Sequence, residues 1–265
     1  MDYRYIDTHS HIYFDAYKDD VSEVLSRMRE EETGTIVIGT SLETSKDAVA
    51  FAKAHPEEVL GATIGLHPNS AEEGFDPALY TPLIDEGVML GVGECGLDFF
   101  RSNPLETFDK QQEVFEAQVD FALQHDLPLM LHVRPSAGSD DAHEECLKVL
   151  EQKQKEHGEK LRGNCHFFTG SLKMAKRYWA LGFTTAFPGV ITFAKELEEV
   201  VASAPLNLIL GETDSPYATP VPFRGERNEP IHVKEIYKKV AEIQNKDEEE
   251  VRVALTENAL RVFGR

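Results

Sequence analysis

Two patterns of apolar and polar residues alternate along this chain. Short, continuous apolar runs such as Thr35-Ile36-Val37-Ile38 are β-branched and predict strands that are buried on both faces. Between such runs lie longer segments, such as residues 104–125, whose apolar residues recur every three or four positions and predict amphipathic helices. The chain is therefore expected to fold as a series of strand and helix units.

The pattern contains eight such units. Strands separated by helices of 10 to 20 residues pair in parallel through right-handed crossovers, and eight units favour a closed barrel over an open sheet. We therefore expect an α/β fold, a (β/α)8 barrel of the TIM type. The predicted strands cover residues 5–11, 35–38, 59–66, 88–93, 128–133, 162–167, 183–187 and 206–210. The predicted helices cover residues 19–32, 44–55, 77–86, 104–125, 141–157, 172–181 and 193–202, with a last pair at 232–244 and 248–262.

Length and composition agree with one folded unit. The 265 residues are close to the roughly 250 that are typical of such a barrel. Hydrophobic residues make up 41% of the chain, which is enough to form a sizeable core. No linker or low-complexity tract interrupts the pattern, so we expect a single domain over residues 1–265. No Gly-x-Gly-x-x-Gly follows the first strand, which argues against a dinucleotide-binding sheet.

The charge balance limits the partners that the chain can attract. The 47 acidic residues outnumber the 27 basic ones, and the net charge of -20 repels polyanions and anionic membrane surfaces. A nucleic acid would therefore have to bind through a local site, and we expect no membrane partner. Cys95, Cys146 and Cys165 form no CxxC pair and are odd in number, which suits a reducing compartment. Without a signal peptide or a membrane span, we expect a cytoplasmic protein, and a monomer fits the sequence.

The opening strand ends in two histidines. His9 and His11 are two residues apart, so they leave an extended strand on the same face and can bind one metal ion. Such a pair alone is often only a polar strand end. In a barrel, however, the C-terminal ends of all strands meet at one rim, where the chemistry of this fold is found. The other strand ends contribute His67, Glu94, His132, His166, Glu212 and Asp214.

These residue types indicate two metal ions rather than one. Six ligands are too many for a single zinc-like ion that must keep an open position. They are His9, His11, His132, His166, Glu94 and Asp214. Glu94, from a middle strand, could bridge two ions about 3.5 to 4 Å apart. Asp214 comes from the last strand, beside the first in a closed barrel, so it could complete the site of His9 and His11 and accept a proton from water.

Residues next to the predicted ligands, and the histidines elsewhere, receive other predictions. Cys95 and Cys165 adjoin predicted ligands on strands, so they should point away from the metals and be buried behind the site. The remaining histidines fall on or near helices and are predicted to be surface residues. They are His55, His125, His143, His157 and His232.

Taken together, the strand-end motifs resemble those of the TatD-like metal-dependent deoxyribonucleases, within the wider amidohydrolase-type barrels. They follow one another in the family order from residue 7 to residue 230, and the set is far more specific than any one of its members. The matching motifs are Asp7-Thr8-His9-Ser10-His11, Gly65-Leu66-His67-Pro68, Gly93-Glu94-Cys95-Gly96-Leu97-Asp98, His132-Val133-Arg134, His166-Phe167-Phe168-Thr169-Gly170, Gly211-Glu212-Thr213-Asp214-Ser215-Pro216 and Arg224-Gly225-Glu226-Arg227-Asn228-Glu229-Pro230.

The resemblance implies a (β/α)8 barrel with two divalent metal ions, magnesium, manganese or zinc. It also implies hydrolysis of phosphodiester bonds in DNA, often as a 3′ to 5′ exonuclease on single-stranded ends. Its implied ligands are His9, His11 and Asp214 for one ion, Glu94 for both, and His132 with His166 for the second. Glu212 is implied as a ligand of a further ion. The implied substrate contacts are Arg134, His67, Arg224, Arg227 and Asn228, and forked guanidinium groups suit phosphate oxygens.

Three positions depart from the family pattern. Asn69 stands where a second histidine is common, and Phe223 and Glu226 stand where histidine and lysine are frequent. The last two changes remove positive charge near the substrate, which lowers the salt-dependent part of nucleic-acid affinity. The sequence also leaves two other readings open. One is an ester or amide hydrolase on the same metals, such as a D-aminoacyl-tRNA deacylase, and the other is a non-catalytic barrel that binds metal or a partner protein.

Overall fold

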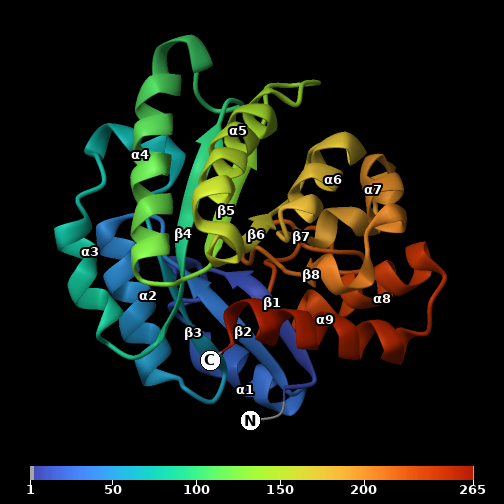
Figure 1. The fold of residues 1–265 in the computed structure, drawn as a ribbon. Coiled ribbons are helices and arrows are strands. Elements are labelled where there is room, and N and C mark those ends of the chain that lie inside the picture. The colour runs from blue at the N-terminus through green and yellow to red at the C-terminus, as the bar shows by residue number, and fades with distance from the viewer. Residues whose placement is uncertain (1–2, 265) are drawn as a thin grey trace.

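The computed structural model describes residues 3–264, and its centre is one eight-stranded parallel sheet with the strands in chain order (Figure 1). The first and last strands meet, because Ser10 bridges Ser215 in parallel and the Asp214 N–H donates to the His9 carbonyl over 2.9 Å. The predicted (β/α)8 barrel is confirmed. Its strands are β1 (Tyr5–Ser10), β2 (Thr33–Ile38), β3 (Val59–Ile64), β4 (Met89–Asp98), β5 (Leu129–Arg134), β6 (Gly163–His166), β7 (Thr184–Phe187) and β8 (Ile209–Gly211).

Helices surround the barrel, and Figure 1 shows α4 and α5 lying over β4 and β5. None of the helices within residues 3–264 combines the length and the hydropathy that crossing a bilayer requires. The α-helices are α1 (Val21–Glu30), α2 (Leu42–Ala54), α3 (Pro77–Ile84), α4 (Pro104–Gln124), α5 (Asp141–His157), α6 (Leu172–Ala180), α7 (Glu198–Ser203), α8 (Val233–Gln244) and α9 (Glu248–Phe263). The short 3-10 segments are η1 (Asp15–Tyr17), η2 (Pro68–Glu73), η3 (Gly158–Lys160), η4 (Gly189–Thr192), η5 (Lys195–Leu197), η6 (Leu206–Leu208) and η7 (Pro230–His232).

Local sequence signals explain where several helices begin. Ser41 caps α2, because its hydroxyl accepts from the Thr44 N–H while the Thr44 hydroxyl accepts from the Ser41 N–H. Asn103 caps α4, and Pro104 occupies a first-turn position where a missing N–H costs nothing. These caps fix the loops that leave the C-terminal ends of β2 and β4, which is where the pocket described below lies.

The predicted element boundaries differ from the structure by more than two residues at three places. β4 continues to Asp98, so Glu94 lies inside a strand rather than after its end. The predicted helix 193–202 is divided between η5 and the short α7, and the predicted strand 206–210 begins as η6 before β8. Short apolar runs carry no strong periodicity, so neighbouring helix and strand turns are hard to tell apart from sequence alone.

The core consists of two main clusters and a small third one, which contains Leu66, Ala71 and Val114. A large cluster lies between the barrel and the helices, and a smaller one joins residues from β1, β2, β4, β5, β7 and β8 with α9. Because β1 and β5 lie on opposite sides of the barrel, the smaller cluster must fill its interior. We call this cluster the barrel floor. It contains Ile6, Ile36, Ile38, Leu90, Met130, Ala186, Leu210, Ala259, Val262 and Phe263.

Two histidines that were predicted at the surface are buried, so that prediction is wrong for them. His143 lies on the inner face of α5 with no exposed surface, and its Nδ1 is 3.3 Å from the Tyr178 hydroxyl. His232 is 7% exposed and stacks on Phe223, with ring centroids 4.2 Å apart. A position on a helix does not tell which face a lone histidine occupies. His157 is exposed, as predicted.

Candidate metal centre

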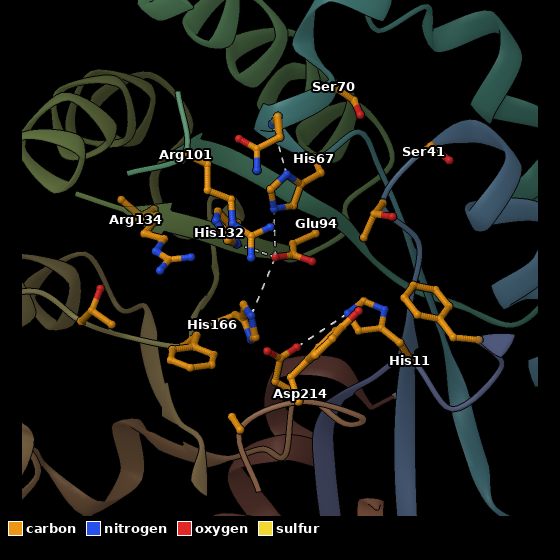
Figure 2. Close-up of a pocket in the computed structure, with 18 of the residues that line it drawn as sticks. His11, Ser41, His67, Ser70, Glu94, Arg101, His132, Arg134, His166 and Asp214 are labelled. Atoms are coloured by element: carbon orange, nitrogen blue, oxygen red, sulfur yellow. Dashed lines mark hydrogen bonds and ion pairs between the residues drawn. The ribbon is translucent and has the colours of Figure 1, made fainter. Parts of the chain in front are cut away.

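The polar strand ends converge in a pocket of about 900 Å³ at the C-terminal rim of the barrel. Figure 2 shows Glu94 near its centre, with His67 and His132 on one side and Asp214 and His11 on the other. Each of these side chains comes from a different strand or from the loop that follows it. The barrel thus assembles, from distant parts of the chain, the residues that the sequence predicted as metal ligands.

The first ligand group joins the two ends of the sheet. The Nε2 atoms of His9 and His11 each lie 3.7 Å from the Asp214 Oδ1. All three ligand atoms fall within 4.8 Å of one another. The side chain of Asp214 is 15% exposed and lines the pocket together with His11, whereas His9 has no exposed surface and is not part of the lining.

The second ligand group is centred on Glu94. Its Oε1 lies 2.6 Å from the His132 Nδ1 and 3.7 Å from the His166 Nε2. Its other oxygen, Oε2, lies 3.6 Å from the His9 Nε2 and therefore reaches the first group. Glu94 consequently has one carboxylate oxygen directed to each group, which is the arrangement that a bridging carboxylate needs.

The residues fit divalent metal ions. Both ring nitrogens of His9 are buried and have no hydrogen-bond partner, a costly state for an imidazole unless another ligand satisfies it. The separations of 3.6 and 3.7 Å from its Nε2 to Glu94 and Asp214 are too long for good hydrogen bonds. They match the spacing of about 3.4 Å between two ligands of one tetrahedral ion with 2.1 Å bonds. Histidine with carboxylate is a donor set that zinc, manganese and related ions accept.

Neighbouring groups orient two of the histidines. The His11 Nδ1 lies 3.2 Å from the Ile38 carbonyl, and this contact directs its Nε2 toward the pocket. The His132 Nε2 lies 3.3 Å from the Asp98 carboxylate, which leaves Nδ1 toward Glu94. Such contacts fix the tautomer and ring orientation of metal-binding histidines.

Glu212 lies behind His166 and contacts this histidine rather than the pocket. Its Oε1 is 3.0 Å from the His166 Nδ1 and accepts from the Phe167 N–H over 2.6 Å. The residue has no exposed surface. Its Oε2 has no partner, and the carboxylate does form a possible ligand group with His9 and His166. In this structure Glu212 thus orients His166, and its predicted role toward a further ion stays a prediction.

The pKa values show how tightly these groups are coupled. Burial raises the pKa of Asp214 to about 7 and lowers the pKa of His11 to about 4. Burial would also lower the pKa of His166, but Glu212 and Glu94 outweigh it and raise the value to about 9. Burial opposes ionisation of Glu94 as well, yet His132 holds the pKa of this carboxyl well below its usual range. Opposite charges thus compensate one another within the site.

Asp7 holds the closure of the barrel beneath the pocket. Its Oδ1 accepts from the Thr213 N–H over 2.8 Å and its Oδ2 accepts from the Thr213 hydroxyl over 2.6 Å. These bonds tie β1 to the loop after β8, one residue before Asp214. Asp214 itself has a φ of 53°, a left-handed conformation that is unfavourable for a residue with a side chain. Asp7 occurs in the first motif, two residues before His9, but nothing in the sequence indicated that it would bind Thr213.

The His67 side of the pocket adds a fourth possible ligand group. His67, Asp98 and His132 have ligand atoms within 4.8 Å of one another, and the His67 Nε2 is 3.7 Å from the Glu94 Oε1. Asn69, one of the departures from the family pattern, donates from Nδ2 to the Asp98 Oδ2 over 3.3 Å. The amide therefore lines the pocket and contacts this group. Asp98 was part of a motif, but the sequence gave it no role.

Two cysteines lie behind the site. Cys95 and Cys165 have no exposed surface, and burial raises the pKa of both thiols well above the ordinary value. A buried, protonated thiol is a poor metal ligand and a poor nucleophile. These two residues therefore pack in the core outside the barrel, as predicted from their strand neighbours Glu94 and His166, which point the opposite way into the site.

The predicted substrate residues are divided between the pocket and its surroundings. Arg134 and His67 line the pocket, together with Arg101, which the sequence analysis missed. Arg101 falls in the loop after β4 without a motif to mark it. Arg224 lies outside the lining, and its guanidinium covers the Phe193 ring at 3.6 Å.

Arg227 and Asn228 contact groups of the protein itself, and their predicted contact with substrate stays a prediction. Arg227 forms ion pairs with Asp20 and Glu229, over 2.6 and 3.1 Å. Asn228 has no exposed surface and donates to the Thr213 and Tyr217 carbonyls over 2.9 and 2.6 Å. Both side chains hold the loop after β8, and Asn228 thereby helps to place Asp214. The predicted phosphate contacts came from the family resemblance, which does not reveal that Asp20 lies beside Arg227.

A parallel eight-stranded barrel with buried histidines and carboxylates gathered at its C-terminal rim defines a metal-dependent hydrolase. Comparison with known proteins gives the family. The model of the family described as TatD related DNase matches residues 6–264, and the chain belongs to this family.

Several relatives share nearly the whole length of the chain. It is 35% identical to YabD of Bacillus subtilis (strain 168), with 97% of this chain and 98% of YabD covered. It is 30% identical to YjjV of Escherichia coli (strain K12), with 98% of each covered. Both relatives are described as uncharacterized metal-dependent hydrolases. The crystal structure of YjjV, described as a TatD homologue, superposes with a TM-score of 0.87 at 28% identity and covers 99% and 98% of the two chains.

Proposed function

We propose that this protein hydrolyses phosphodiester bonds in DNA and removes nucleotides from the 3′ end of single strands, with two divalent metal ions in its site. The observation that carries the proposal is the pocket itself. It combines two ligand groups that share Glu94 with two guanidinium groups, those of Arg101 and Arg134, on one side of that carboxylate (Figure 2). A substrate that fits both features is an anion with a hydrolysable phosphate.

The arginines of the pocket are unusual in so acidic a protein. Within residues 3–264, Arg101, Arg134 and Arg224 form no ion pair with a carboxylate. Two others without such a pair, Arg4 and Arg261, lie at the opposite end of the barrel, before β1 and in α9. An unpaired guanidinium is available to an incoming phosphate, and it creates local positive potential in spite of the net charge. The arginines that do pair with carboxylates are Arg27, Arg29, Arg162, Arg177, Arg227 and Arg252.

The chemistry divides between the ions and the side chains. Bound divalent ions supply a water of lowered pKa and stabilise the charge that develops on phosphate oxygens. Asp214 faces the pocket and accepts the proton of the attacking water. Arg134 and Arg101 hold the oxygens of the scissile and neighbouring phosphates and so fix the phosphorus for attack. His132 stays oriented through Asp98, and His166 through Glu212, so that neither ring turns away from Glu94.

Shortening of an end-labelled single strand tests the proposal directly. The purified protein should shorten 3′-labelled or 5′-labelled DNA with magnesium or manganese but not with chelator, and the label position gives the direction of attack. Asp214→Asn should keep most of the bound metal and lose most of the turnover, because its amide no longer accepts the proton. No shortening with any metal, together with cleavage of an ester or amide substrate, would assign the site to carbonyl hydrolysis instead.

A further inference from the structure

Exposed aromatic side chains gather at the rim of the barrel. Within residues 3–264, the exposed aromatic residues are Phe100, Phe193 and Tyr217, with 55%, 44% and 56% of their surface accessible. They follow β4, β7 and β8 respectively, so all three lie at the end of the barrel that carries the pocket. Tyr217 is part of the pocket lining. Large aromatic rings left in water cost free energy, and their confinement to one end indicates a ligand with flat apolar faces.

Two of these rings carry an arginine without an acidic partner. The Arg134 guanidinium lies over the Phe100 ring with its Cζ 4.0 Å from the centroid, and the Arg224 guanidinium lies over the Phe193 ring at 3.6 Å. Both guanidinium groups therefore combine a flat stacking surface with a positive charge that no carboxylate neutralises. The two pairs stand on different sides of the rim, one at β4 and β5 and the other at the loops after β7 and β8.

The Phe193 pair is connected to the pocket wall through the backbone. The Phe193 N–H donates to the carbonyl of Val190, a residue of the pocket lining. The loop that carries Arg224 is held against η4 because the Val221 N–H donates to the Thr192 hydroxyl over 2.9 Å. This pair is therefore a fixed extension of the pocket, although neither of its side chains lines the pocket.

From this arrangement we infer that the Phe100–Arg134 and Phe193–Arg224 pairs are base-stacking subsites, which bind two nucleotides of a single strand outside the metal centre. The inference rests on the proposed function and adds the residues that recognise the bases. Proteins that bind single strands without reading sequence combine cationic groups for the backbone with aromatic rings for the bases. Bases in a duplex are already stacked on one another, so these subsites select single strands and longer substrates over dinucleotides.

Binding of a fluorescent twelve-nucleotide strand tests the inference without turnover. The strand carries phosphorothioate linkages, and a second strand of the same length is abasic at all but its terminal nucleotides. Fluorescence anisotropy gives the Kd of each strand for the wild type, Phe100→Ala, Phe193→Ala and Phe100→Trp. Leu105→Ala is the matched control, since Leu105 is an apolar residue at the start of α4 that is 95% exposed and has no arginine over it.

The inference predicts that each Phe→Ala variant weakens binding of the normal strand by about tenfold. Phe100→Trp and Leu105→Ala should bind as the wild type does. The abasic strand should bind weakly and equally to all variants, because it has no internal bases to stack. Equal affinity of the wild type for both strands would overturn the inference, and so would loss of affinity for both strands in the Phe→Ala variants. Failure of the proposed function would appear separately, as absent shortening of end-labelled DNA by the wild type.

Discussion

The interior of the barrel has two halves that are built from the same strands: the apolar barrel floor and the polar rim that carries the metal centre. In β5, Met130 belongs to the barrel floor, and His132, two residues later on the same strand face, belongs to the metal centre. In β8 and the residue that follows it, Leu210 and Glu212 show the same order. In these two strands the change from floor to rim thus takes place within two residues.

The difference between them lies in what satisfies the buried atoms. The floor is aliphatic, and its side chains need only close packing, which stabilises the fold by roughly 1.5 to 3 kcal/mol for each fully buried large side chain. The rim leaves polar atoms such as the His9 Nε2 and the Glu212 Oε2 buried without a partner. Such atoms cost about 1 to 3 kcal/mol each. The rim is therefore maintained by the stability of the floor, and function and stability should separate on mutation.

The largest expected effect is a difference in kcat between variants of two buried glutamates at opposite ends of the barrel. Glu94→Gln removes the charge shared by both ligand groups, so kcat should fall by at least about a thousandfold. Glu58, which precedes β3 at the other end, is 2% exposed and pairs with Arg29. Because Arg29 is half exposed, Glu58→Gln should cost at most about 1 kcal/mol and leave kcat within twofold. Initial rates and urea unfolding of both variants would measure this, and equal rates in the two would contradict the division.

A cavity in the floor should give the reverse result. Met130→Ala removes a fully buried side chain, and the free energy of unfolding should fall by about 2 to 5 kcal/mol. Since Met130 is not part of any ligand group, the molecules that remain folded should keep their metal content and their kcat within a few-fold. Urea denaturation and metal analysis of the folded fraction provide the two measurements. Loss of metal from folded Met130→Ala would show that floor and rim are not separable.

Stabilisation of the protein by metal should depend on residues of the rim and not on those of the floor. At a free manganese concentration about 100 times the Kd, binding to the native state adds about 2.7 kcal/mol of stability. For a chain of this length, that is a rise in Tm of roughly 5 to 10 °C. Met130→Ala should show the full rise from its lower starting Tm, and Glu94→Gln should show little of it. Thermal unfolding with and without chelator decides this, and an equal rise in Glu94→Gln would remove Glu94 from the ligands.

The sequence predicted which residues meet at the rim, but it did not predict the hydrogen bonds that hold them in place. The strand ends could be identified because apolar runs stop at ionisable residues, and barrel closure brings such ends together whatever their distance along the chain. His9, Glu94 and Asp214 meet for this reason. Asp7 could not be recognised, because its role depends on a hydrogen bond to Thr213 more than two hundred residues away. The fold class followed from eight repeated units. The start of β8 and the division of the predicted helix 193–202 into η5 and α7 depended on packing.

The arginines show the same limit most clearly. Arg134, Arg224 and Arg227 looked equivalent as predicted phosphate contacts. The structure separates them, since Arg227 is held by Asp20 and Glu229 while Arg134 and Arg224 lie on aromatic rings. Whether a guanidinium is free depends on which carboxylates the fold brings near it. No spacing in the sequence contains that information.

The smallest expected effect concerns these free arginines. Arg134→Gln should weaken binding of a single strand and reduce the slope of log K against log salt by about 0.7, which corresponds to one phosphate contact. Arg177→Gln is the matched control, because Arg177 pairs with Glu151 over 2.7 Å on the helical shell, away from the pocket lining. Its affinity and its salt slope should equal those of the wild type. Anisotropy titrations between about 50 and 200 mM salt would resolve the difference. A normal slope in Arg134→Gln would show that this guanidinium contacts no phosphate, and would leave Arg101, Arg224 and the metal ions as the positive charges of the rim.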